Sequence, residues 1–215
     1  MAQNAPMHTH HPIPGKEQIA LLEPFERLGL DRIHQVTTGA QAERACAALA
    51  AARFWGFDTE SRPTFAKGQE SEGPHIVQLA TLDAAWVFQL HDPDCSDLVA
   101  ELLTRPGVTK AGFGLGDDRK RIQHKLGVEA TDVLELNTVL RQRGYRKDMG
   151  VKATVAVLFN RRFIKSKKAT TSNWAATHLS ENQVQYAGED AFAALQSALF
   201  TPASRAVARR WWFAK

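Results

Sequence analysis

Two carboxylates end an apolar run in the first third of the chain. Residues 51–57 read as a buried strand, and Asp58 and Glu60 follow at once in "FDTE". Because side chains two residues apart in a strand point to the same side, both carboxylates are expected to leave one face together. Like charges that close repel unless something neutralises them. A strand that simply turns polar at the surface would read the same way, so other residues must decide between the two interpretations.

Further acidic residues follow a second apolar strand and lie on a late helix. The stretch "AGFGLGDD" places Asp117 and Asp118 at its end, and Tyr186 and Asp190 lie four apart in "YAGEDA". Four residues apart in a helix means one shared face. Open α/β sheets build their sites at strand ends, so these groups are expected to meet Asp58 and Glu60. The glycine pattern alone is weak evidence for a phosphate cradle, because two aspartates would repel a bare phosphate.

Three segments together resemble a known enzyme family. "FDTE", "KAGFGLGDDRKRI" and "KSKKATTSNWAATHLSENQVQYAGEDA" are similar to the three motifs of the 3′-to-5′ exonucleases that have four acidic residues and a catalytic tyrosine. That group contains ribonuclease D and the Werner-type exonuclease domain. The resemblance extends over roughly residues 54–199. It implies that Asp58, Glu60, Asp118 and Asp190 are metal-binding carboxylates and that Tyr186 is the catalytic tyrosine.

Two positions test this resemblance. The family pattern has a single aspartate where this chain has Asp117-Asp118, and alignment of "GFGLGDD" favours Asp118. The sister group of exonucleases has a histidine five residues before the last aspartate, a position that is Gln185 here. The tyrosine subclass is therefore the one that the sequence predicts.

The resemblance implies a two-metal-ion 3′-5′ exonuclease that hydrolyses phosphodiester bonds and releases 5′-mononucleotides. Hard ions such as Mg²⁺ or Mn²⁺ prefer carboxylate oxygens, and two of them about 4 Å apart can activate a water and stabilise the leaving oxygen. Asp58 is expected to bridge both ions, with Glu60 and Asp190 completing the shell of one. Asp118 is expected to hold the other ion largely through water, and Tyr186 to orient the attacking water.

The basic residues indicate a nucleic-acid partner with a free 3′ end. The chain has 27 Lys and Arg against 23 Asp and Glu, and its basic residues cluster three times in its second half. Such clusters favour a phosphate backbone. Lys165, Lys167 and Lys168 are expected to hold the strand's phosphates, with a solvated loop as the equal alternative.

The substrate is left open between DNA and RNA. The chain stops soon after its last helix, which favours the Werner-type branch, and hence DNA, over an RNA-trimming exoribonuclease similar to ribonuclease D. A nucleic-acid-binding module with a decayed nuclease centre is the other alternative. The presence of all four carboxylates and the tyrosine argues against decay.

The elements that must position these residues follow from periodicity. Helical patterns run from Thr38, over residues 97–104 and 116–127, and after Ser180. Ser180 followed three residues later by Gln183 predicts a capping box at the start of the last helix. Strand patterns lie at residues 75–81 and 85–90, spaced as a hairpin, and at 109–115 and 133–136. This order predicts an α/β fold with a mixed sheet covered by helices on both faces. The resemblance implies a ribonuclease H-like fold with a five-stranded mixed sheet.

The chain is expected to be one domain after a loose start. Residues 1–17 are polar and carry Pro12, Pro14 and Gly15, which predicts a flexible tail, and residues 18–215 are expected to form a single exonuclease domain. No apolar run approaches the ~18 residues that a membrane span needs, and the N-terminus lacks the apolar core of a secretory signal. Two cysteines far apart give no disulfide framework. These features predict a cytoplasmic protein without a membrane partner.

Overall fold

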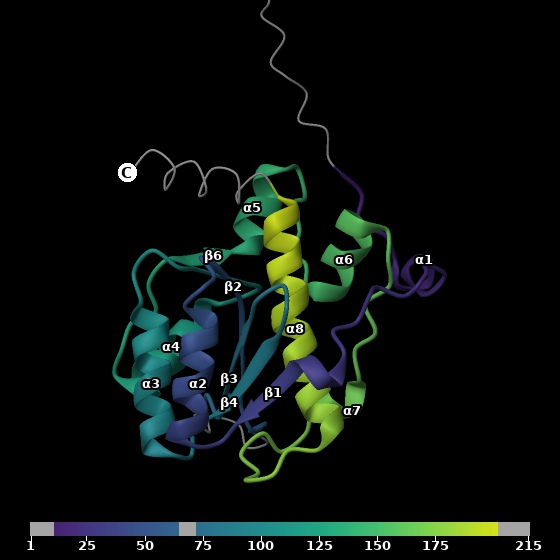
Figure 1. The fold of residues 1–215 in the computed structure, drawn as a ribbon. Coiled ribbons are helices and arrows are strands. Elements are labelled where there is room, and N and C mark those ends of the chain that lie inside the picture. The colour runs from purple at the N-terminus through teal and green to yellow at the C-terminus, as the bar shows by residue number, and fades with distance from the viewer. Residues whose placement is uncertain (1–10, 65–71, 202–215) are drawn as a thin grey trace, which may run out of the picture.

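A six-stranded mixed sheet organises the protein. The computed structural model describes residues 11–64 and 72–201 (Figure 1). The strands lie in the order β1-β4-β3-β2-β5-β6. They are β1 (Ile33–Val36), β2 (Phe54–Glu60), β3 (Ile76–Ala80), β4 (Ala85–Gln89), β5 (Thr109–Gly112) and β6 (Val133–Glu135). Five of them were predicted from periodicity, including the β3–β4 hairpin, which is antiparallel as expected.

The prediction of a five-stranded sheet was wrong by one strand, β1. This strand pairs in parallel with β4, with Ile33 opposite Ala85 and Val36 opposite Phe88. Its two apolar residues are three apart and pack into the cores on opposite faces of the sheet. Because β1 has apolar residues at its two ends and polar residues between them, apolar and polar residues do not alternate along it. The segment is a strand only because it pairs with β4.

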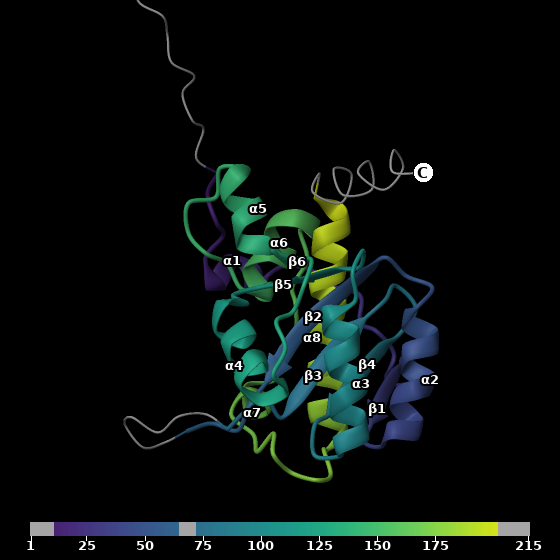
Figure 2. The same ribbon diagram turned by 90° about the vertical axis from the view of Figure 1, so that its left-hand side faces the viewer.

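Helices cover both faces of the sheet (Figures 1 and 2). One face carries α2 (Gly39–Leu49), α3 (Pro93–Thr104) and α4 (Gly116–Leu126), which pack on Trp55, Phe57 and Leu79. The other face is crossed by the long α8 (Glu181–Phe200), and α5 (Leu136–Gln142), α6 (Val151–Phe159) and α7 (Lys167–Thr170) lie around α8. The fold class predicted from the sequence is thereby confirmed.

The N-terminal part of the described chain runs along this second face. It contains the short helix α1 (Lys16–Ala20) and the 3₁₀ turn η1 (Leu30–Arg32). The predicted tail at residues 1–17 therefore overlaps the start of α1, while residues 1–10 lie outside the described residues. Pro24 forms an isolated parallel bridge with Arg162, which ties this segment to the chain before α7.

Helix α8 lies directly on β2 because of one glycine. A Cβ added at Gly56 would stand 1.7 Å from the backbone oxygen of Ala191 and 3.0 Å from the Cβ of Leu195. Any side chain there would therefore push α8 away from the sheet. The start of α8 is fixed by the predicted capping box, in which the Ser180 hydroxyl accepts from the backbone N–H of Gln183. These two features hold the Asp190 segment of α8 against the end of β2.

Among the helices in residues 11–64 and 72–201, none has the length and apolarity needed to cross a bilayer.

Candidate active site

Three carboxylates meet where β2 ends. Asp58 and Glu60 leave β2 on the face covered by α8, and Asp190 comes from α8 itself. One carboxylate oxygen from each of the three lies within 4.8 Å of the others. The period of two along β2 and the close approach of α8 at Gly56 thus bring together residues 130 or more positions apart.

Asp118 approaches from the opposite layer. It lies in the first turn of α4, and the hydroxyl of Thr59 donates a 2.5 Å hydrogen bond to its Oδ1. Thr59 points away from α8 because it alternates with Asp58 and Glu60. Asp117 is exposed and pairs with Lys120 at 3.1 Å. Asp118, rather than Asp117, is thus the aspartate of this pair that faces β2, although it lies outside the group of three carboxylates.

Burial and mutual repulsion dominate the electrostatics of the cluster. Burial raises the pKa of Asp58 well above its usual range, and the charges of Asp190, Glu60 and Asp118 raise it further. The pKa of Glu60 rises to about 8, first through burial and then through the charge of Asp190. Burial also raises the pKa of Asp118, against the hydrogen bond from Thr59. A positive charge is needed to hold these groups ionised together.

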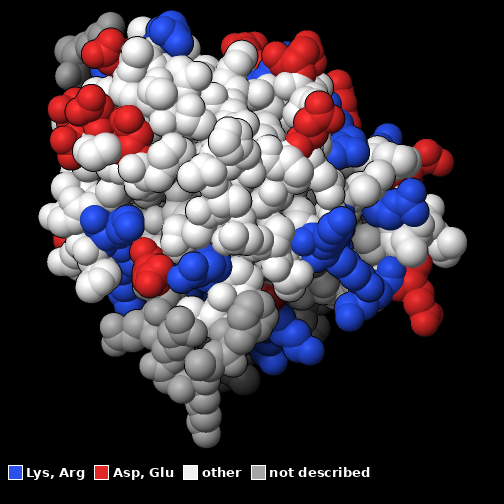
Figure 3. Space-filling view, turned by 90° about the horizontal axis from the view of Figure 1, so that it is seen from below, with Lys and Arg blue, Asp and Glu red and all other residues white. Residues whose placement is uncertain are grey.

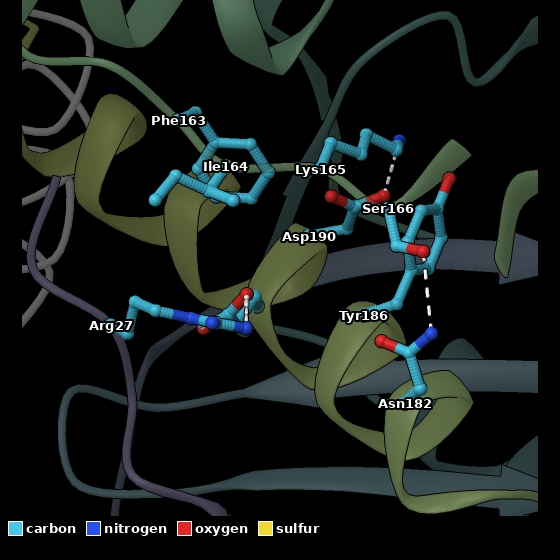
Figure 4. A pocket seen from close by; sticks show the side chains of 9 residues that line it. Arg27, Phe163, Ile164, Lys165, Ser166, Asn182, Tyr186 and Asp190 are labelled. Atoms are coloured by element: carbon cyan, nitrogen blue, oxygen red, sulfur yellow. Dashed lines mark hydrogen bonds and ion pairs between the residues drawn. The ribbon is translucent and has the colours of Figure 1, made fainter. Parts of the chain in front are cut away.

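Lys165 supplies such a charge in this structure (Figure 4). Its ammonium lies 2.5 Å from Oδ2 of Asp190, and 24% of the Lys165 side chain is exposed. Neither oxygen of Asp190 accepts a hydrogen bond of regular geometry within the described part of the chain. Burial would lower the pKa of Lys165, but the neighbouring Asp190 and Tyr186 raise it above its usual value.

Tyr186 lies one turn before Asp190, with its ring buried. Its hydroxyl accepts a 3.3 Å hydrogen bond from Thr170 of α7, and its ring packs against Trp174 with centroids 5.7 Å apart. The ammonium of Lys165 lies 4.6 Å from the ring centroid. Burial raises the pKa of Tyr186 to about 12, and the charge of Asp190 adds to this. The phenol is therefore held neutral, in a position to direct a hydrogen bond.

Glu189 does not add a free charge to the cluster. The guanidinium of Arg27 binds it through two contacts, Nε to Oε1 at 2.5 Å and Nη2 to Oε2 at 3.0 Å, and Gln185 donates to Oε1 at 2.8 Å. Arg27, Glu189 and Asp190 also line a small pocket beside Tyr186. A bidentate contact of this kind is geometrically specific, so Glu189 is turned away from Asp190 and its neighbours.

The other two predicted phosphate-binding lysines lie apart from the cluster. Lys167 and Lys168 are exposed on α7, which begins at the N-cap Ser166 next to Lys165. Figure 3 views the end of the sheet where β2 finishes. Lys and Arg gather at the right, on the side of α7, whereas at the left Lys and Arg alternate with Asp and Glu. A basic surface thus lies on the α7 side, as contact with a polyanion would require.

The donor set fits hard divalent cations. It consists of carboxylate oxygens in a partly buried cluster, and the buried Asp190 has the ammonium of Lys165 beside its Oδ2. Oxygen donors of this kind suit Mg²⁺ or Mn²⁺, which retain some water ligands. The site residues named from the sequence therefore have the chemistry that a metal centre needs.

Three contacts of the site were missed by the sequence interpretation. Thr59 could have been found from strand alternation, since it must point to the layer that carries α4. Arg27 lies 162 positions from Glu189, and no spacing connects them. Thr170 reaches Tyr186 only because the chain before α8 folds back across it.

The chain is similar to several known proteins. The 3′-5′ exonuclease family model matches residues 33–200. A 3′-5′ exonuclease of Arabidopsis thaliana is 29% identical over 145 residues, which are 65% of this chain and 49% of that protein. The bifunctional 3′-5′ exonuclease/ATP-dependent helicase WRN of Mus musculus is 25% identical over 142 residues, 65% of this chain and 10% of WRN. The chain thus spans at most about half the length of these relatives.

A solved structure shows the same fold. Trypanosoma brucei RNase D in complex with RNA U12 superposes with a TM-score of 0.69 at 17% identity, covering 86% of this chain and 64% of that one. At this identity the likeness concerns the fold alone. The family match covers most of the chain, including all the segments that form the carboxylate cluster. This chain belongs to the 3′-5′ exonuclease family.

Proposed function

We propose that this domain hydrolyses phosphodiester bonds at the 3′ end of nucleic acid and releases 5′-mononucleotides, with the help of two divalent metal ions. The observation that carries the proposal is the meeting of Asp58, Glu60 and Asp190, with ligand oxygens within 4.8 Å of one another. Asp118, held by Thr59, would complete the ligand set. The family match supports the direction of cleavage.

Bound Mg²⁺ or Mn²⁺ would supply an activated water and would stabilise the charge of the leaving oxygen. The residues of the chain have separate tasks. Asp58, Glu60 and Asp190 would hold the ions together with Asp118, which comes from α4. Tyr186 stays protonated at neutral pH, since its pKa is about 12. It therefore acts as a positioning hydrogen-bond group for the attacking water rather than as a base.

The substrate is a strand with a free 3′ end, held by its phosphates. Lys167 and Lys168 on α7 are exposed and lie next to the segment that carries Lys165, so they can contact the backbone of an incoming strand. We favour DNA slightly, as the resemblance of the three motifs to the Werner-type exonuclease domain implies. RNA is the alternative, and the fold shared with an RNase D bound to RNA supports it.

The experiment uses 5′-labelled DNA and RNA oligonucleotides of one sequence, incubated with Mg²⁺, Mn²⁺ or excess EDTA. We expect ladders that shorten from the 3′ end, mononucleotide products, and no cleavage in EDTA. A closed circular substrate is the control, since an exonuclease cannot enter it. Cleavage of the circle, shortening from the 5′ end, or full activity in EDTA would contradict the proposal.

A further inference from the structure

The ammonium of Lys165 lies beside the carboxylate cluster, where a positive charge is needed before metal binds. It contacts the buried Asp190 at 2.5 Å and lies over the ring of Tyr186 at 4.6 Å. Asp190 in turn belongs to the group of three carboxylates. Lys165 therefore partly neutralises a site in which like charges are crowded and partly buried.

The backbone on both sides of Lys165 is fixed. Before it, Arg162 donates its N–H to the carbonyl of Glu23 at 2.8 Å and accepts from the N–H of Phe25 at 2.9 Å. Phe163 is buried, and after Lys165 the hydroxyl of Ser166 caps α7. A change in the position of the ammonium is thus a change of side-chain rotamer. The four-carbon stem of lysine permits this without movement of the fold.

Bound metal ions would remove the need for the positive charge of Lys165. Asp58, Glu60, Asp118 and Asp190 carry four negative charges when ionised, which two divalent ions would balance. Glu189 gives Lys165 no alternative partner, because Arg27 and Gln185 already bind it. Lys165 would then be a surplus cation beside the position of the substrate's phosphate.

We propose that Lys165 is an exchangeable counterion: it occupies Asp190 in the metal-free protein and releases it when the ions bind, turning toward the strand's phosphate. This inference rests on the proposed metal-dependent function. It makes Lys165 a positioning residue that competes with metal for Asp190, which a lysine serving only as a phosphate contact would not do. Coupling between two competing ligands of one group is reciprocal, so removal of the lysine must strengthen metal binding.

The test is calorimetric titration of the metal-free protein with MnCl₂ in the absence of nucleic acid. Lys165→Met should bind Mn²⁺ about tenfold more tightly than the unaltered protein, within the usual range for coupled sites. Lys165→Arg, which keeps the charge, should stay close to the unaltered protein. Lys152→Met is the matched control, because it removes the same charge from an exposed position on α6 and should leave the affinity unchanged.

A second measurement needs no variant. Lysine acetylation followed by mass spectrometry should label Lys165 slowly in the metal-free protein and several-fold faster with Mn²⁺, while Lys152 reacts equally in both. Equal or weaker Mn²⁺ binding by Lys165→Met, or unchanged labelling of Lys165, would overturn the counterion role and leave the proposed function intact. Absence of Mn²⁺ binding by the unaltered protein would instead refute the metal-dependent function itself.

Discussion

The close contact between Gly56 and α8 predicts that a methyl group at position 56 will disrupt the carboxylate cluster. In Gly56→Ala the new Cβ would meet the backbone oxygen of Ala191 at 1.7 Å, far inside the 3.4 Å at which ordinary contact begins. A backbone carbonyl inside a helix cannot rotate away, so α8 must shift as a whole or β2 must distort. Ala191 follows Asp190 directly, so the shift moves Asp190 away from Asp58 and Glu60.

The expected loss of stability depends on the type of atom that the new Cβ would contact. Overpacking a core typically costs 1–3 kcal/mol and occasionally more. Because backbone rather than a side chain obstructs the methyl group, we expect Gly56→Ala to lower the free energy of unfolding by about 3 kcal/mol or more. Gly188→Ala provides a graded comparison. Its Cβ would meet the side chain of Ile33 at 2.6 Å, which can adjust, so a loss of about 1–2 kcal/mol is expected.

The assay is urea unfolding followed by circular dichroism, together with calorimetric titration of MnCl₂ at a temperature where each variant is folded. Gly56→Ala should bind Mn²⁺ at least about tenfold more weakly, a loss of 1.4 kcal/mol. Gly116→Ala is the control, because nothing lies within 4 Å of its new Cβ. A Gly56→Ala protein with unchanged stability and unchanged Mn²⁺ affinity would refute the argument that this glycine sets α8 on β2.

Three further predictions concern the site itself. Tyr186→Phe should lower the cleavage rate roughly 10²–10⁴-fold with unchanged Mn²⁺ affinity, and full turnover of a labelled oligonucleotide would withdraw the positioning role. Asp58→Asn should abolish cleavage yet leave the metal-free melting temperature equal or higher, because it relieves repulsion from its neighbours; a lower melting temperature would count against its placement. The metal-free protein should lose stability as pH rises from about 5 to about 8, because the raised pKa of Glu60 lets the folded state bind more protons than the unfolded chain, with a slope of at most about 1.4 kcal/mol per pH unit. Urea unfolding across this range should show a smaller slope for Glu60→Gln, and an equal slope in both proteins would exclude this origin.

The sequence by itself determined the local geometry of the site. The alternation in "FDTE" is enough to place Asp58 and Glu60 on one face of the sheet and Thr59 on the other. Helical spacing placed Tyr186 and Asp190 one turn apart, and the Ser180–Gln183 box marked where α8 begins. These features depend on the periods of single elements, 2.0 residues in a strand and 3.6 in a helix, so they can be predicted from the sequence.

The tertiary structure alone decided which residues meet across elements. Strand β1 forms because it pairs with β4, since the sequence of β1 itself has no period of two. Arg27 binds Glu189 and Lys165 binds Asp190 because packing brings their elements together. Periodicity specifies the face on which a side chain lies but not the group that lies opposite. For long charged side chains, the partner follows from how the layers pack and from the cost of leaving a buried charge unpaired.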